Sequence, residues 1–316
     1  MKKMNKDLKL NITEKLEDYL KKNEMSANEF SDSYNIPSNY ISQIRNGKDF
    51  VMAGEDKKVM IHPKYYRQIA KSIGFKMEKE YWRTKVTPQF NQILGVLEDA
   101  KEFGYTNIII GETGCGKSYL SDLFVKSYIK DAFKITVGSM DTISDLLDKI
   151  CESLKIQSGT SKSKRIKDII KKLTSLKLEG YEPILIFDEA EYLKQSTLCN
   201  MKELHDHLNQ HCGLILIGTD QLIKKLEQLR KKNKDGMPQF YSRIKFGIRY
   251  LKSIDTNFSE FVGGFQDKDL VKFLQNYCTS YRELHDVLVP AMREADRLRE
   301  PLTENLVRKV LNLPPL

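Results

Sequence analysis

Gly111-Glu112-Thr113-Gly114-Cys115-Gly116-Lys117-Ser118 is the stretch that decides the fold of this 316-residue chain. It follows the apolar run 107–110 and opens a predicted helix, so G-x-x-x-x-G-K-[ST] occurs in its required strand, loop and helix setting. The glycines let successive backbone N–H groups and the helix N-terminus point at phosphate oxygens. A chance glycine turn would lack the flanking strand, so the stretch predicts a phosphate-binding loop.

The chemistry of this loop predicts ATP and Mg²⁺ as cofactors. Lys117 supplies a positive charge to the β- and γ-phosphates, and the Ser118 hydroxyl is a predicted Mg²⁺ ligand. The predicted nucleotide-binding residues are Thr113, Gly114, Cys115, Gly116, Lys117, Ser118 and Tyr119.

A second motif lies seventy residues further on, where the apolar run 184–187 ends in Asp188 and Glu189. Ligands of open α/β sheets bind at the carboxyl ends of the strands, where both carboxylates would lie. Asp188 is predicted to position Mg²⁺, and Glu189 to activate the attacking water. Adjacent carboxylates can merely cap a helix, but together with the phosphate loop they predict ATP hydrolysis.

Strands and helices alternate through the rest of the core. This alternation predicts an α/β fold, in which a five-stranded parallel sheet has helices on both faces. The predicted strands cover residues 107–110, 133–137, 184–187, 214–217 and 245–250.

Three further segments resemble conserved parts of the AAA+ ATPases. Residues 214–220 resemble the sensor-1 strand, where Thr219 suits a phosphate better than Asp220 because a carboxylate would be repelled; the sequence leaves the choice open. Residues 239–244 resemble the arginine-finger segment and make Arg243 a predicted catalytic residue. Residues 280–284, in an all-helical tail, resemble sensor 2 and make Arg282 a predicted catalytic residue as well, although lone arginines are usually solvated.

The resemblance implies a homo-oligomer. An arginine finger acts on the nucleotide of a neighbouring subunit, so an isolated subunit lacks a charge that stabilises the transition state. Whether the assembly is a ring or a helical filament is left open.

The N-terminal region has the strongest positive charge. Residues 1–85 contain 18 basic and 12 acidic side chains, within a chain of net charge +9. Two short predicted helices joined by a turn at residues 35–38 resemble the helix-turn-helix of phage repressors. Such a module binds DNA, although some bind protein, and the segment 48–61 is longer than usual. The residues predicted to face DNA are Ser38, Asn39, Tyr40, Ser42, Gln43 and Arg45.

Two basic runs in the core, 162–167 and 224–234, have the composition of loops that follow DNA phosphates, although a solvated surface explains them equally well. Their predicted DNA-binding residues are Lys162, Lys164, Arg165, Lys231 and Lys232.

Composition excludes several classes of protein. No apolar run is long enough to cross a membrane and no signal peptide is recognised, so a cytoplasmic protein is expected. The five scattered cysteines never form a C-x-x-C pair, which argues for free thiols rather than disulfides or a zinc site.

The order of these motifs predicts four segments. They are a helix-turn-helix domain over 1–76, a linker over 77–86, an AAA+ core over 87–252 and a helical lid over 253–316. This order resembles the family of the phage Mu B transposition protein. The resemblance implies an ATP-dependent, non-specific DNA-binding protein that oligomerises on DNA and delivers this target DNA to a transposase. A helicase loader or replication initiator, and an ATP-switched transcriptional regulator, remain as alternatives.

Overall fold

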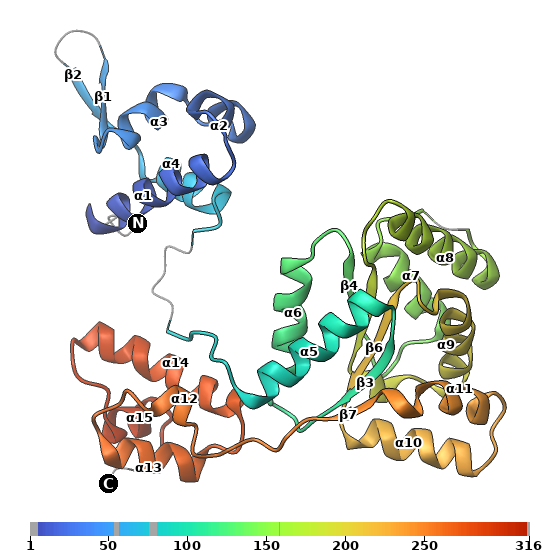
Figure 1. Cartoon of the computed structure of the whole chain (residues 1–316). Coiled ribbons are helices and arrows are strands. Elements are labelled where there is room, and N and C mark those ends of the chain that lie inside the picture. The colour runs from blue at the N-terminus through green and yellow to red at the C-terminus, as the bar shows by residue number, and fades with distance from the viewer. Residues whose placement is uncertain (1–5, 54–56, 76–80, 158, 315–316) are drawn as a thin grey trace. The chain divides into compact units, whose positions relative to one another are not determined.

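The computed structural model describes residues 6–53, 57–75, 81–157 and 159–314, and divides into the compact units Met1–Arg83 and Thr84–Leu316 (Figure 1). Residues 76–80, which include the first part of the predicted linker, and Ser158 of the loop before the first basic run lie outside the described residues. In the described part of the chain, no helix is both long enough and apolar enough to span a membrane.

The first unit is a helical module. A capping box between Ser26 and Glu29 starts α2, and Pro63 at the first position starts α4. Apolar side chains of all four helices share one core, to which α3 contributes Ile41 and Ile44. The helices are α1 (Lys6–Lys22), α2 (Ala27–Tyr34), α3 (Ser38–Arg45) and α4 (Pro63–Ser72).

The long segment between α3 and α4 forms an antiparallel pair of strands, β1 (Phe50–Ala53) and β2 (Lys57–Met60). Residues 54–56 lie outside the described residues. Ile61, directly after β2, is buried in the core of the module, so the added length is accommodated without loss of the helical packing.

The second unit is built on a five-stranded sheet with the order β4-β5-β6-β3-β7, and each neighbouring pair is parallel. This arrangement confirms the predicted fold class. The predicted fifth strand begins only at Ile248, because α11 continues into a 3-10 helix over Lys245–Gly247. The strands are β3 (Thr106–Ile110), β4 (Ala132–Thr136), β5 (Ile184–Asp188), β6 (Gly213–Gly218) and β7 (Ile248–Tyr250).

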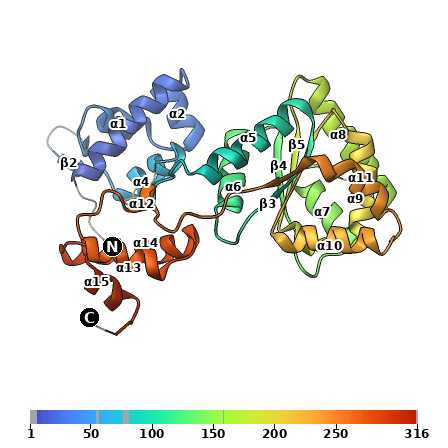
Figure 2. The same ribbon diagram turned by 60° about the horizontal axis from the view of Figure 1, so that its bottom comes forward.

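Alternate residues of the central strands feed two hydrophobic cores, because successive side chains point to opposite faces of the sheet. One face, which includes Ile109 and Ile186, packs against α5 and α6. The other, which includes Ile108 and Phe187, packs against α7 to α11, as Figures 1 and 2 show. The helices are α5 (Pro88–Phe103), α6 (Lys117–Ser127), α7 (Ile143–Ser153), α8 (Lys162–Leu178), α9 (Gln195–Leu208), α10 (Asp220–Lys231) and α11 (Met237–Ile244).

Helices follow the sheet in the segment predicted as the lid, a name kept here for them, and a buried glutamine of α5 binds this segment. Gln89, 1% exposed, donates from Nε2 to the carbonyls of Lys252 and Ser253 at 3.0 and 2.8 Å. Its Oε1 accepts a 2.9 Å hydrogen bond from the Tyr281 hydroxyl. The start of α5 therefore holds both the lid and the connector, the segment 251–258 that leads from β7 to the lid. The lid helices are α12 (Ser259–Val262), α13 (Lys268–Tyr277), α14 (Tyr281–Leu298) and α15 (Glu304–Val310).

Candidate nucleotide site

The predicted phosphate loop lies between β3 and α6. Gly114 and Gly116 have φ values of +78° and +98°, which L side chains rarely adopt, so glycine is needed at both positions. The Lys117 ammonium donates to the carbonyl oxygens of Gly111 and Glu112, at 2.7 Å each. The charge predicted to meet the phosphates is thus held over the loop by the loop's own carbonyls.

The two acidic residues at the end of β5 have different environments. The Asp188 side chain is 5% exposed, and its Oδ1 accepts a 3.0 Å hydrogen bond from the backbone N–H of Glu189. Glu189 is exposed and has a φ of +57°, in the left-handed region. The turn therefore buries Asp188 and leaves Glu189 exposed.

Lys134, in the middle of β4, joins this site although the sequence analysis did not select it. Its ammonium lies 3.0 Å from Asp188 Oδ2, 2.7 Å from Asp122 Oδ1 and 3.0 Å from the Ser118 carbonyl oxygen. The phosphate loop helix and the β5 carboxylate therefore converge on one side chain. A lysine between Phe133 and Ile135 in an apolar strand was the signal available in the sequence.

The oxygen donors fit a Mg²⁺ ion that arrives with a nucleotide. Among the described residues there is no group of three His, Cys, Asp or Glu side chains that could hold a metal by itself. Mg²⁺ typically binds through one or two carboxylates together with substrate phosphates. Asp188 and the Ser118 hydroxyl would supply the protein ligands, and the bound ion would neutralise charge on the phosphates.

The sensor candidate Thr219 is engaged by another glutamate. Its hydroxyl donates a 3.1 Å hydrogen bond to Oε1 of Glu191, and Lys225 donates to the Glu191 carbonyl at 2.9 Å. Glu191 Oε2 is buried and has no partner among the described residues. Burial lowers the pKa of Lys225, with Glu191 opposing that effect. Asp220 is exposed, in the first turn of α10.

Arg243 lies on α11 and contacts α9. Its guanidinium donates two hydrogen bonds to Asp206, and a third at 2.9 Å to the Gln239 carbonyl. Burial raises the pKa of Asp206, but hydrogen bonds from Arg243 and His205 outweigh it and leave the pKa below its ordinary value. The pair is therefore ionised at neutral pH, and it ties Arg243 to α9 of the same chain.

The lid approaches the phosphate loop at Gly114. A Cβ placed on Gly114 would lie 2.7 Å from both Cβ and Oγ of Ser280, and 3.3 Å from Cβ of Arg282. Glu112 Oε2 also accepts a 3.3 Å hydrogen bond from the backbone N–H of Ile254, in the connector to the lid. The fold thus brings the predicted residue Arg282 to the phosphate loop, and its side chain is exposed there.

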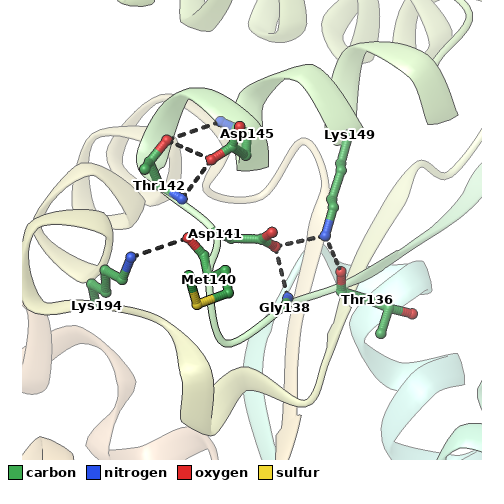
Figure 3. Close-up of polar contacts among 8 residues, drawn as sticks. All are labelled: Thr136, Gly138, Met140, Asp141, Thr142, Asp145, Lys149 and Lys194. Carbon is green, nitrogen blue, oxygen red and sulfur yellow. Dashed lines mark hydrogen bonds and ion pairs between the residues drawn. The ribbon is translucent and has the colours of Figure 1, made fainter.

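An exposed loop adjoins the carboxylate turn, because the N–H of Val137 donates to the Asp188 carbonyl at 2.9 Å. Figure 3 shows how this loop is held: Asp141 accepts from the Gly138 N–H at 2.7 Å and from Lys149 at 2.6 Å. Lys194 donates to the Met140 carbonyl at 3.2 Å, while the Met140 residue is 85% exposed. The loop is thereby tied to the segment that follows Asp188 and Glu189.

The predicted DNA-facing residues of the first unit differ in exposure. Ser38, Asn39, Ser42 and Arg45 are exposed on α3, opposite the buried Ile41 and Ile44. Tyr40 and Gln43 are only partly exposed.

Two of these residues have partners within the module. Tyr40 packs edge-on against Tyr65, with ring centroids 4.7 Å apart. Arg45 donates two hydrogen bonds to Glu17 of α1, one of them 3.1 Å long. Tyr40 therefore has a packing role, and Arg45 has a competing partner.

The two basic runs are largely helical, which corrects their interpretation as loops. Lys162, Lys164 and Arg165 lie in the first turn of α8, where the Ser161 hydroxyl caps the helix. Lys231 ends α10 and Lys232 follows it. Apolar residues at helical spacing, such as Ile166 and Leu226, bury one side of each helix and order these segments.

Only part of the first run is free to contact a ligand. Arg165 donates to Ser144 at 2.7 Å and pairs with Asp148 at 3.0 Å, with a side chain 15% exposed. Lys162 and Lys164 are exposed.

Comparisons with known proteins agree with this geometry. Residues 105–226 match the AAA domain family. Over 193 residues the chain is 24% identical to the Mu-like prophage FluMu DNA transposition protein B of Haemophilus influenzae. The aligned region covers 60% of this chain and 65% of that protein.

Solved structures of similar fold include two archaeal proteins. The Aeropyrum pernix ORC2 protein, in ADPNP-ADP complexes, is 17% identical, with a TM-score of 0.54 over 74% of this chain and 70% of that chain. The Aeropyrum pernix ORC1 protein in complex with DNA is 17% identical, with a TM-score of 0.50 over 72% of this chain and 66% of that chain. The phosphate loop, the β5 carboxylates and these similarities together identify an AAA+ fold with an AAA domain at residues 105–226, related in sequence to protein B of Mu-like transposition.

Proposed function

We propose that this protein is an ATPase that binds DNA without sequence preference, oligomerises on it with ATP, and delivers the bound DNA to a transposase. The observation that carries the proposal is the convergence of Ser118, Asp188 and the lid residue Arg282 around one phosphate loop, in a chain similar to a transposition protein B.

The site supports hydrolysis as well as binding. Lys117 and the N–H groups of the loop would hold the β- and γ-phosphates, and Asp188 with Ser118 would hold Mg²⁺. Glu189 would orient and deprotonate the attacking water, since it is exposed beside the buried Asp188. The Thr219 hydroxyl would give up its hydrogen bond to Glu191 and contact the γ-phosphate. Arg282 would contact the nucleotide from the lid.

Two surfaces support DNA binding. The exposed face of α3 carries Ser38, Asn39, Ser42 and Arg45, and a helix of this kind fits the major groove. Lys162, Lys164, Lys231 and Lys232 are exposed and would contact phosphates, which carry no sequence information. The ORC1 protein, of similar fold, has been solved with DNA.

Oligomerisation is supported by the surface around α11. Arg243 is held at the surface, and Phe246, three residues later, is 80% exposed. An exposed aromatic beside an arginine is typical of the centre of a protein interface. In the proposed oligomer Arg243 would leave Asp206 and reach the nucleotide of the neighbouring subunit.

A second candidate function is replication initiation, which the ORC fold similarity favours. An initiator or helicase loader would bind origin sequences or a replicative helicase. An ATP-switched transcriptional regulator would bind one operator. Binding to an origin or an operator predicts a sequence-specific footprint, and a helicase loader predicts binding to a replicative helicase. The transposition function instead predicts binding to random DNA that requires ATP and weakens steeply with salt.

The deciding experiment combines electron microscopy with DNA binding, using random-sequence duplex with ATP, ADP or no nucleotide. We expect the protein to form oligomers on DNA with ATP, but not with ADP or without nucleotide. The Glu189→Gln variant should form stable assemblies, because this variant binds ATP but hydrolyses it poorly. Lys117→Ala is expected to lose both ATP binding and assembly. A protein that stays monomeric with ATP and DNA, or that protects one sequence only, would contradict the proposal.

A further inference from the structure

Lys134 is a charged residue with a largely buried side chain in β4, which is an edge strand of the parallel sheet. It lies in β4 between Phe133 and Ile135, opposite Ile186 of β5, and its side chain is 12% exposed. Burying an ammonium group is costly unless charged or polar partners compensate it. Packing alone therefore does not explain a lysine at this position.

Three oxygens surround the ammonium. They are Asp188 Oδ2 at 3.0 Å, Asp122 Oδ1 at 2.7 Å and the Ser118 carbonyl oxygen at 3.0 Å, so two carboxylates and one carbonyl face the same point. These are the ligand types that divalent cations such as Mg²⁺ prefer. Without the lysine, the same oxygens would form a site of net negative charge that attracts a divalent cation.

We propose that Lys134 is a resident counter-ion that takes the place of a divalent cation at Asp188 when no nucleotide is bound. It keeps the nucleotide-free protein from binding Mg²⁺ at this point, so the metal enters only with the phosphates that complete its ligands. The inference concerns the protein without nucleotide and depends on neither hydrolysis nor DNA binding.

The test measures thermal unfolding of the full chain without nucleotide, in EDTA and in millimolar Mg²⁺ at matched ionic strength. Mg²⁺ should leave the melting temperature of the wild type unchanged. In EDTA, the melting temperature of Lys134→Met should be lower than that of the wild type. In Mg²⁺ it should rise by about 3 °C or more, because the ion binds only the folded state. Lys134→Arg keeps the charge and should not respond to Mg²⁺.

The chain contains a matched control. Lys101, whose side chain is also 12% exposed, pairs with Asp131 at 2.6 Å in another buried ion pair. Lys101→Met should be destabilised but should gain no response to Mg²⁺, since Lys101 does not contact Asp188, Asp122 or Ser118. An equal response in Lys101→Met would overturn the proposal, as would one in the wild type or none in Lys134→Met.

A double variant tests the proposal if Lys134→Met folds poorly. Combining it with Asp188→Asn removes both charges of the pair, so the double variant should regain stability and lose the Mg²⁺ response. If Lys134→Met stays unfolded in Mg²⁺ and the double variant does not recover, Lys134 is needed for packing alone and the counter-ion role is excluded.

Discussion

Arg243 on α11 and Asp206 on α9 face each other through two hydrogen bonds, from Nε to Oδ1 and from an Nη to Oδ2. In the proposed oligomer, Arg243 would have to give up Asp206 to reach the nucleotide of another subunit. The contact with Asp206 would then compete with the contact between subunits.

Changing the two partners separately gives the first prediction. Arg243→Ala should lower ATP turnover on DNA by about 10³-fold and leave ATP binding by the monomer unchanged, because the lost charge acts on the transition state of a neighbour. Asp206→Asn removes the charge that pairs with Arg243, so it should weaken the contact between α9 and α11 and retain turnover or raise it. Steady-state hydrolysis over a range of protein concentrations is the measurement. Equal losses in both variants would mean that the pair is structural.

The second prediction decides which residue is the γ-phosphate sensor. Thr219→Val removes the hydrogen bond to Glu191 Oε1 and should lower turnover by about 10-fold or more, with ATP affinity little changed. Asp220→Asn should change neither, because Asp220 is exposed at the start of α10. Single-turnover hydrolysis together with ATP titration separates the two effects. Loss of turnover in Asp220→Asn alone would reverse the assignment.

Much of this site could be predicted from the sequence, because its motifs are local. The phosphate loop and the β5 carboxylates each need only a strand followed by a turn, and the fold places both at the same edge of the sheet. Lys134, Glu191 and Gln89 could not be found in this way. Their partners come from β5, α6, α10, the segment after β7 and the lid, so their roles depend on tertiary contacts that periodicity does not encode.

The two basic runs show where prediction from charge composition failed. Charge composition suggested loops, but Ile166 and Leu226 bury one side of each segment and make it a helix. Charge density also could not reveal that Arg165 is paired with Asp148, or that Arg45 is paired with Glu17. Positive charge predicts an attraction to DNA, whereas the acidic partners decide which side chains are free to respond.

The third prediction concerns Arg45, for which Glu17 would compete with DNA under the proposed function. Glu17→Gln should tighten binding to random duplex by about 3-fold or more, and Arg45→Gln should weaken it, with a shallower dependence on salt. Titration of a labelled duplex at several salt concentrations measures both. The control is Glu294→Gln, which frees Arg297 of the exposed lid pair and should leave DNA affinity unchanged.

The same ion pair gives a dependence on pH. The hydrogen bond from Arg45 lowers the pKa of Glu17 below its ordinary value of 4.5. The stability that the pair contributes is therefore present above pH 4.5 and is lost as the pH falls through the lowered pKa. Glu17→Gln should remove this part of the acid sensitivity, as circular dichroism of the full chain at decreasing pH would show. An unchanged acid profile would mean that the pair adds nothing to stability.

The last prediction uses two glycines of the phosphate loop as a matched pair. Gly114 and Gly116 both have positive φ, so alanine at either costs about 1 kcal/mol of backbone strain. Only at Gly114 would the new Cβ meet the lid, 2.7 Å from Ser280 Cβ and Oγ, whereas nothing lies within 4 Å of it at Gly116.

Gly114→Ala should therefore displace the lid and lower ATP affinity about 10-fold more than Gly116→Ala does. Adding Ser280→Gly to Gly114→Ala removes the clashing side chain and should restore much of the affinity, because glycine in place of serine as the N-cap of α14 costs only a few tenths of a kcal/mol. Titration with a fluorescent ATP analogue measures all four proteins. Equal losses in the two alanine variants, without rescue, would show that lid contact at Gly114 does not contribute to nucleotide binding.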